Sequence, residues 1–452
     1  MLEFKVENLG KIKDATFKIN KFTVVTGQNG TGKSFFSKSL YSIFSTIENY
    51  SVKKFFSTNL DNFKNITLHQ KNLLSKHKDY SSNVELISDI EFILNYIEKI
   101  QKELDFDVNK ELAFENEDIV CFKEEVLKLK HEFEKRLSVL EKESSIYYEH
   151  GIEYFKFLLF MSDGLISTYS VVLQSQISNE LRENFQVQTV SELINFDAQE
   201  AKISCEDLFS ITLNKENKID VDLEVDAINF FRKKPNSVFF ESPAYWRVRD
   251  ALIDAKMKSG DNYLSGVPKY FFDLDSSLKL KSKEVTLYPD VYNEIKSELN
   301  GEFKIENNEL SFIEGDNNKI SKNLVSFGMT NIGMLNTLIA NNVVNEGSYI
   351  FIDEPETNLH PDWQILMIKS LIKLSEFGVN VIINTHSIEI LKFIEIYFKK
   401  FVGENIDDLL SVNFIDNDGT MLEFDSSCPY EQVKEARSTL SSSYFELYMD
   451  DK

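Results

Sequence analysis

The chain has 452 residues, of which 42% are hydrophobic and 27% are charged, and it carries a formal net charge of −23. This composition is typical of a globular protein with a packed core and argues against wholesale disorder and low-complexity architecture. The negative charge disfavours indiscriminate contact with nucleic acid or an anionic membrane, although residues 1–80 hold 13 basic and 6 acidic side chains and are locally positive.

No segment of the chain indicates export or membrane insertion. The N-terminus, MLEFKVENLGKIKDATF, interleaves charges with apolar residues and lacks the apolar region of a signal peptide. The most apolar later stretch, 155–173, is interrupted by Lys156, Asp163 and Gly164, which argues against a membrane span. The three cysteines form no CxxC pair, so neither a disulfide framework nor a zinc site is indicated. We expect a cytoplasmic protein without a membrane partner.

The strongest local signal lies at 22–34. FTVVT is a strand-like run that leads into the P-loop GQNGTGKS, which a helical segment follows. The spacing G-x4-G-K-S brings backbone N–H groups against phosphate oxygens at a helix N-terminus. We expect Lys33 to reach the β- and γ-phosphates of ATP and the Ser34 hydroxyl to bind Mg²⁺. The expected nucleotide-binding residues are Asn29, Gly30, Thr31, Gly32, Lys33 and Ser34.

A long helical region follows, because all seven prolines lie at position 235 or later. Two apolar stripes with alternating spacings of three and four run over 86–104 and 122–140. An acidic segment separates them and predicts an antiparallel helical hairpin. The stripes fit two amphipathic helices of an ordinary bundle and also a projecting coiled coil, because each lasts only about three heptads.

Two later segments are predicted as strands, and each is followed by side chains that could bind a metal or take part in catalysis. Residues 349–352 form a buried strand that ends in Asp353 and Glu354, and residues 379–384 form another that leads to His386. Since parallel strands place their carboxyl ends at the ligand face, we expect Asp353 to bind Mg²⁺, Glu354 to deprotonate the attacking water and His386 to contact the γ-phosphate. An apolar strand is also predicted before Pro243. The cluster Arg232, Lys233 and Lys234 precedes it and could bind phosphate or nucleic acid, although such cations more often form a solvated face.

Three blocks resemble the AAA-family ATPases of the ABC type, the heads of the SMC, Rad50 and RecF sort and their compact bacterial relatives: FKVENLGKIKDATFKINKFTVVTGQNGTGKS, IFIDEPETNLHP and VIINTHS. The resemblance implies an α/β head with a mainly parallel sheet and an antiparallel β N-terminal lobe, interrupted by an α-helical, coiled-coil-like insertion. The implied parts are 1–75 with the P-loop, the helical insertion 76–195, and 196–452 with the remaining motifs. Two heads of such proteins sandwich ATP, which implies a homo-oligomer.

The same resemblance places a signature-like motif at Ser326-Phe327-Gly328-Met329, where Ser326 and Gly328 would bind the nucleotide of the other head. The motif departs from the usual Ser-Gly-Gly-Gln ending, and a Ser/Gly helix start is the alternative explanation. Glu356 and Asn358 lie where the D-loop would follow. No Q-loop can be placed, because Gln70 has no strand-end context.

The chain also resembles the ATPase subunits of the bacterial antiphage systems PARIS and Septu, including retron-associated versions. This resemblance implies a subunit that senses infection, with nucleic acid or a phage protein as trigger, and holds a separately encoded nuclease or toxin. The alternative is a RecF- or Rad50-like repair ATPase that clamps DNA. The acidic balance of −9 over 81–150 and again over 401–452 favours a protein partner.

Overall fold

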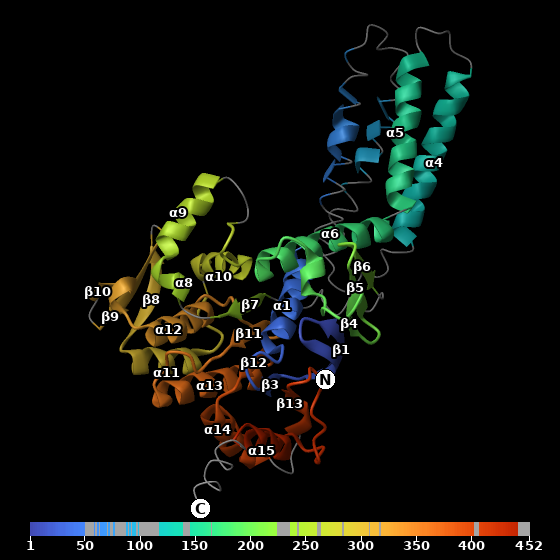
Figure 1. Cartoon of the computed structure of the whole chain (residues 1–452). Helices are drawn as coiled ribbons and strands as arrows, with labels where there is room; N and C mark the ends of the chain where they lie inside the picture. Colours follow the sequence, from blue (N-terminus) through green and yellow to red (C-terminus); the bar gives the residue numbers. More distant parts are fainter. Residues whose placement is uncertain are drawn as a thin grey trace, which may run out of the picture. The chain divides into compact units, whose positions relative to one another are not determined.

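The structure is a computed structural model (Figure 1). It describes residues 1–49, 117–138, 145–163, 165–223, 236–241, 244–259, 264–282, 284–306, 308–315, 318–401 and 406–441, with scattered positions between 58 and 98. The chain divides into two compact units: the first comprises 1–48 with 173–452, and the second comprises 49–172.

A five-stranded parallel sheet forms the centre of the first unit, in the order β13-β3-β12-β11-β7. The predicted strands are confirmed, since three of them are the central strands of this sheet and the strand expected before Pro243 is its edge strand. Their bounds are β3 Phe22–Gly27, β7 Ser237–Phe240, β11 Tyr349–Asp353, β12 Asn380–Thr385 and β13 Leu410–Ile415. Because all five run in one direction, the carboxyl ends of β3, β12 and β11 meet at a single edge.

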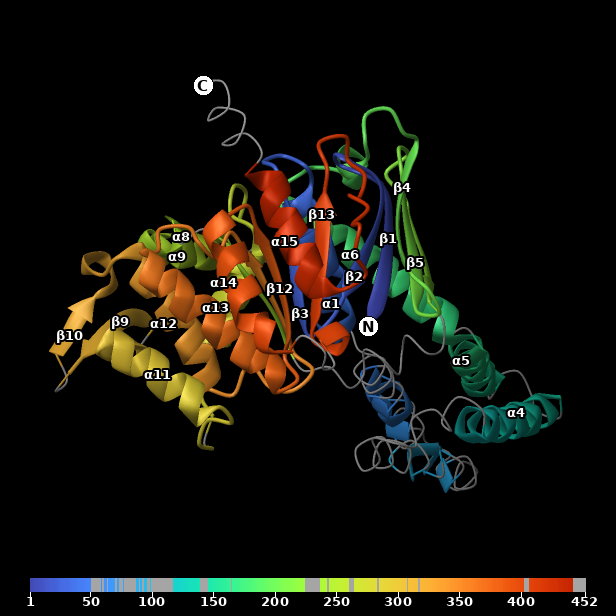
Figure 2. The ribbon, with the colours of Figure 1, turned by 90° about the horizontal axis from the view of Figure 1, so that it is seen from below.

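Helices cover both faces of the parallel sheet. Figure 2 shows α13, α14 and α15 on one face and α1 on the other. Aromatic side chains of α1 pack against the sheet. The ring centroids of Phe44 and Tyr349 are 4.6 Å apart, and those of Tyr41 and Phe239 are 5.5 Å apart. The bounds are α1 Lys33–Asn49, α13 Pro361–Glu376, α14 Ile388–Phe398 and α15 Pro429–Leu440.

An antiparallel sheet forms the predicted β lobe of the first unit, in the order β2-β1-β4-β5-β6. It joins distant parts of the chain, because β1 pairs with β4 and aligns Phe4 with Cys205. The strands are β1 Leu2–Leu9, β2 Ile12–Ile19, β4 Glu200–Cys205, β5 Phe209–Asn214 and β6 Ile219–Leu223. Together, the two sheets confirm the α/β fold with a parallel sheet and an antiparallel lobe.

The rest of the first unit holds a small sheet, β10-β9-β8, and further helices. Helix α12 packs against β8, and Phe303 comes so close that a Cβ on Gly333 would lie 2.2 Å from its ring. The elements are α8 Ala244–Arg247, α9 Arg249–Ser259, α10 Lys269–Lys279, α11 Pro289–Leu299, β8 Gly301–Glu306, β9 Glu309–Glu314, β10 Asn318–Ser321 and α12 Phe327–Ala340, with short 3-10 turns at Val190–Leu193, Lys322–Leu324, Lys399–Phe401 and Ile406–Asp408.

The second unit is helical. Its helices α4 (Glu117–Leu137) and α5 (Ser145–Asp163) pack together, with the rings of Phe133 and Phe155 edge to face at 4.9 Å. Within the second predicted stripe, Val126 and Phe133 are buried; within the first, Ile90 and Ile93 are buried, whereas Leu86, Ile97, Ile100 and Leu104 lie outside the described residues. The helices of the described residues include none long and apolar enough to cross a membrane.

The limits of the second unit, 49–172, differ from the expected insertion 76–195. At the downstream end the reason is visible in α6 (Leu165–Phe185), whose residues from Leu173 onward belong to the first unit. There Ile177 and Leu181 are fully buried, and the Asn184 amide donates to Ser42 of α1 at 2.9 Å.

Candidate nucleotide site

The P-loop connects the end of β3 to the start of α1, and two of its glycines are required by their surroundings. Gly27 and Gly32 have φ angles of +140° and +113°, a region that residues with a Cβ rarely adopt. A Cβ on Gly27 would lie 2.2 Å from the Ile415 carbonyl oxygen, and one on Gly32 would lie 2.7 Å from the Ile12 side chain. The loop therefore lies tightly between β13 and β2, with Asn29 and Gly30 exposed.

Lys33 is the first residue of α1 and is 6% exposed. Its Nζ donates to the backbone oxygens of Gly27 at 2.9 Å and Gln28 at 2.6 Å. Burial lowers the pKa of Lys33, and the nearby carboxylates, Asp353 first, oppose that shift. The ammonium group thus has carbonyl partners that phosphate oxygens could replace. Thr31 supports the loop, because its hydroxyl donates to the Gln28 oxygen at 3.1 Å.

Ser34 and Asp353, the two expected Mg²⁺ ligands, are brought together. Asp353 ends β11 and accepts a hydrogen bond from Asn384, whose Nδ2 is 2.9 Å from Oδ1, and the Ser34 hydroxyl lies near enough to lower the pKa of Asp353. Burial raises the pKa of Asp353, and the side chains of Asn384 and Ser34 oppose the rise. A hydroxyl beside a buried carboxylate is a donor set that suits Mg²⁺ together with phosphate oxygens. The residues present therefore fit the metal.

Asn384 was not predicted as a site residue. It is fully buried in β12, between β3 and β11, and its Oδ1 accepts a hydrogen bond from Ser37 of α1 at 2.7 Å. A chain of polar contacts thus joins Ser37, Asn384, Asp353 and Ser34. The available signal was the asparagine that ends the predicted strand VNVIIN directly after three apolar residues.

Glu354 and His386, the expected catalytic residues, face each other. The Glu354 backbone adopts a left-handed φ of +53° and donates its N–H to the Asn384 oxygen at 2.9 Å. Its carboxylate is 47% exposed, lies 3.5 Å from Nδ1 of His386 and accepts a hydrogen bond from Thr357 at 3.3 Å. Nδ1 of His386 is buried and has no hydrogen-bond partner among the described residues. Both side chains thus lie at the sheet edge where the P-loop begins, and both can form further hydrogen bonds.

Glu356, expected in the D-loop, holds the end of β12. Its Oε1 accepts from the Thr385 hydroxyl at 2.9 Å and from the His386 backbone N–H at 3.2 Å. Burial raises its pKa, and these hydrogen bonds oppose the rise. Glu356 therefore fixes the backbone that carries His386.

Three further charged groups near this site, Glu241, Lys38 and Lys11, were not predicted. Glu241 follows β7, where its carboxylate binds Nζ of Lys38 at 2.6 Å and the Tyr270 hydroxyl. Lys38 lies one helical turn after Ser34 in α1. On the other side of the P-loop, Nζ of Lys11 lies 3.5 Å from the position that a Cβ on Gly30 would occupy. The Lys38–Glu241 contact could not be found locally, since 203 residues separate these two side chains in the sequence.

The signature-like residues begin α12. The Ser326 hydroxyl is exposed and accepts from the Met329 backbone N–H at 3.2 Å, as an N-cap does. A Cβ on Gly328 would lie 2.7 Å from the Asn358 carbonyl oxygen, so close packing against the D-loop segment requires glycine there. The Arg247 guanidinium lies 4.5 Å from the centre of the Phe327 ring. The Ser326 carbonyl oxygen accepts a hydrogen bond from the Thr330 hydroxyl, so both partners of Ser326 are residues of α12.

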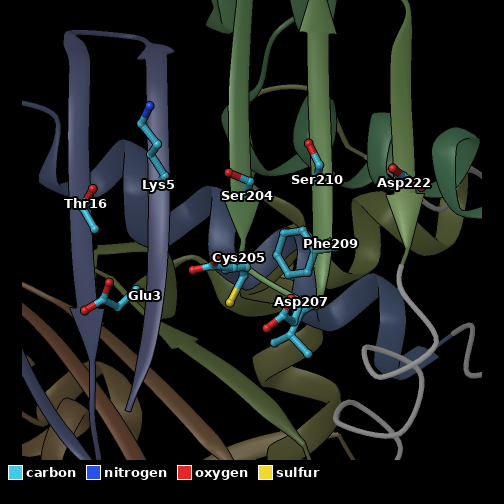
Figure 3. Close-up of a pocket in the computed structure, with 11 residues that line it drawn as sticks. Glu3, Lys5, Thr16, Ser204, Cys205, Asp207, Phe209, Ser210 and Asp222 are labelled. Carbon is cyan, nitrogen blue, oxygen red and sulfur yellow. The ribbon is translucent and has the colours of Figure 1, made fainter.

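The other sequence candidates lie elsewhere or outside the described residues. Gln70 and the cluster Arg232, Lys233 and Lys234 are among the residues that the structure does not describe. A separate cavity of about 450 Å³ lies on the antiparallel sheet (Figure 3), where Glu3, Asp207 and Asp222 contribute carboxylates. None of the predicted site residues lines it.

Residues 1–391 match the profile of the family described as AAA ATPase domain. Among solved structures, the SMC head domain from Thermotoga maritima is similar at 12% identity over 94% of this chain and 99% of that chain, with a TM-score of 0.35. An Smc head domain with an extended coiled coil from Pyrococcus furiosus, bound to the C-terminal domain of ScpA, is similar at 9% identity over 96% and 98%, with a TM-score of 0.39. The curated proteins give no match. Because the profile covers most of its length, the chain belongs to the AAA ATPase domain family.

Proposed function

We propose that this chain binds ATP with Mg²⁺ and hydrolyses it to ADP and phosphate. The observation that carries the proposal is the convergence of Lys33, Ser34, Asp353, Glu354 and His386 at the edge where β3, β12 and β11 end. These side chains come from three segments that lie far apart in the sequence. Their types match the tasks of phosphate binding, metal binding and water activation.

Each residue then has a distinct task. The backbone N–H groups of the P-loop and the start of α1 hold the phosphates, and Lys33 exchanges its carbonyl partners for phosphate oxygens. Ser34 and Asp353 hold Mg²⁺, which when bound neutralises phosphate charge. Glu354 takes a proton from the attacking water, and His386 donates a hydrogen bond towards the γ-phosphate. Glu356 and Asn384 keep these groups in place.

We further propose that two copies of the chain close around ATP. The exposed Ser326 hydroxyl, with Gly328, would meet the nucleotide of the other copy. Its surroundings support an interface, because Leu324 is 81% exposed just before it and the Arg247 guanidinium lies on Phe327. Closing and reopening such a pair with each nucleotide cycle would let the ATPase act on a bound partner.

For the biological role, we propose an ATPase subunit of a bacterial antiphage complex that holds a nuclease or toxin. The acidic balance over 81–150 and 401–452 supports a protein partner. The DNA-clamp alternative draws on the positive balance of residues 1–80 instead. We would purify the wild-type protein with the product of its neighbouring gene, and separately titrate it with duplex DNA at low and high salt.

The result expected is a stable complex with the neighbouring protein, whose activity depends on nucleotide, and negligible duplex binding at low salt. Strong salt-dependent DNA binding with DNA-stimulated hydrolysis, and no protein complex, would replace the antiphage role with the DNA clamp. Hydrolysis that Lys33→Ala leaves unchanged would overturn the ATPase proposal itself.

A further inference from the structure

A small cavity lies between α12 and the turn that follows β11. Its volume is about 10 Å³, and its polar lining comes from Glu241, Asn331, Asp353, Glu354 and Thr357. A cavity of this size is about the smallest that can hold one water molecule, and a buried water needs two to four polar partners. The cavity therefore has both the room and the partners for a single water directly behind the proposed catalytic carboxylate.

Asn331 is the polar residue through which α12 lines the cavity. Its Oδ1 is buried and accepts no hydrogen bond from any described residue. Buried amide oxygens in folded proteins are almost always paired, with protein groups or with ordered water. A water in the cavity would supply the missing donor.

The opposite wall of the cavity is the turn that carries Glu354. This turn is held in an unfavourable conformation, because Glu354 has a φ of +53° without being glycine. Thr357, which also lines the cavity, donates to Oε2 of Glu354 at 3.3 Å. A water fixed between Asn331 and this turn would therefore restrict the direction of the Glu354 carboxylate.

We propose that Asn331 is a positioning residue for ATP hydrolysis. Its amide oxygen holds a buried water, and that water keeps the Asp353–Thr357 turn in the geometry in which Glu354 can accept a proton. This inference rests on the proposed ATPase function. Asn331 itself touches neither nucleotide nor attacking water.

The test compares Asn331→Leu with Asn336→Leu. Asn336 is a matched control because it lies on the same helix, is 1% exposed and has no hydrogen-bond partner for its amide among the described residues, yet does not line the cavity. We expect Asn331→Leu to lower kcat about tenfold or more without changing ATP affinity, since only the water-activation step is affected. Asn336→Leu should keep the wild-type kcat, and Asn331→Ser, which retains an acceptor oxygen, should recover most of it.

Two further measurements separate this role from a structural one. In the Glu354→Gln background, Asn331→Leu should cause no additional loss of hydrolysis, because both changes act on one step. A high-resolution crystal structure of the wild type should show a water bonded to Oδ1 of Asn331. An empty cavity, equal losses in the two leucine variants, or a full additional loss in the Glu354→Gln background would each overturn the inference. If wild-type protein bound no ATP, the proposed function would fail, whereas the crystallographic water would still be a separate observation.

Discussion

The side-chain amide of Asn384 donates a hydrogen bond to the carboxylate of Asp353 across two neighbouring parallel strands, at 2.9 Å. The pairing register aligns these two residues, so the contact is a direct product of the sheet. Asn384 also accepts a hydrogen bond from Ser37 of α1. The P-loop helix and the strand that ends in Asp353 are therefore joined through one buried side chain.

Replacing Asn384 with leucine should weaken Mg²⁺ binding. The substitution removes a donor to Asp353 and an acceptor for Ser37 while keeping a side chain that branches at Cγ. Loss of a residue that orients a metal ligand typically costs about 10- to 100-fold in metal affinity, so hydrolysis should need correspondingly more Mg²⁺. The measurement is a Mg²⁺ titration of ATP hydrolysis. Asn413→Leu is the control, because Asn413 is a buried asparagine of β13 that binds the Lys18 backbone instead, and it should leave the Mg²⁺ requirement unchanged.

Glu354→Gln should separate ATP binding from hydrolysis. The amide cannot accept the proton of the attacking water, so turnover should fall by about 10²- to 10⁴-fold while nucleotide affinity is kept. Because ATP persists, the closed pair of chains should accumulate in sedimentation experiments with ATP and not with ADP. Normal turnover in this variant would show that Glu354 is not the base.

His386→Ala should slow hydrolysis by about tenfold or more with a smaller effect on ATP binding. The reason is that Nδ1 of His386 lies 3.5 Å from the Glu354 carboxylate and 3.6 Å from that of Glu356, at the end of the strand beside the P-loop. Single-turnover hydrolysis, measured with enzyme in excess, reports this step. His360→Ala is the control, because His360 is exposed at the start of α13, and equal losses in both variants would argue against a role for His386 at the phosphate.

Glu48 should make the stability of the protein depend on pH. Burial raises the pKa of this carboxyl from its ordinary value of 4.5 to about 7, although it accepts the Ser237 backbone N–H at 2.9 Å. The folded chain then retains a proton that the unfolded chain releases, so stability falls as the pH rises from about 4.5 through about 7. Glu48→Gln keeps an acceptor oxygen and cannot ionise.

The melting temperature of Glu48→Gln should equal that of the wild type near pH 4.5 and exceed it by several degrees near pH 8. Glu200→Gln, a change at an exposed position, should follow the wild-type curve. A constant difference between Glu48→Gln and the wild type across this range would contradict the assignment.

The sequence predicted those site residues whose structural context is formed by their neighbours in the chain. The P-loop residues and the acids after β11 carry their context within ten residues, because a buried strand, a turn and a helix start are all readable there. Asn384 and Glu241 could not be predicted in the same way. Their partners, Asp353 and Lys38, are 31 and 203 residues away and become neighbours only through the strand order and register.

The same limit applies to the helical insertion. A helical insertion was expected, but not the point at which α6 passes from one compact unit to the other, because apolar residues on a helix do not indicate which unit buries them. Asn331 gave no signal at all, since a polar residue on a helix is most often solvated.

The most direct test of the central claim is equilibrium binding of ATP with Mg²⁺ to the wild type and to Lys33→Ala, followed by hydrolysis with the same two proteins. The account predicts that the wild type binds and hydrolyses ATP, and that Lys33→Ala, which removes the buried ammonium group from the loop, abolishes both. Unchanged ATP binding and turnover in a correctly folded Lys33→Ala protein would contradict it.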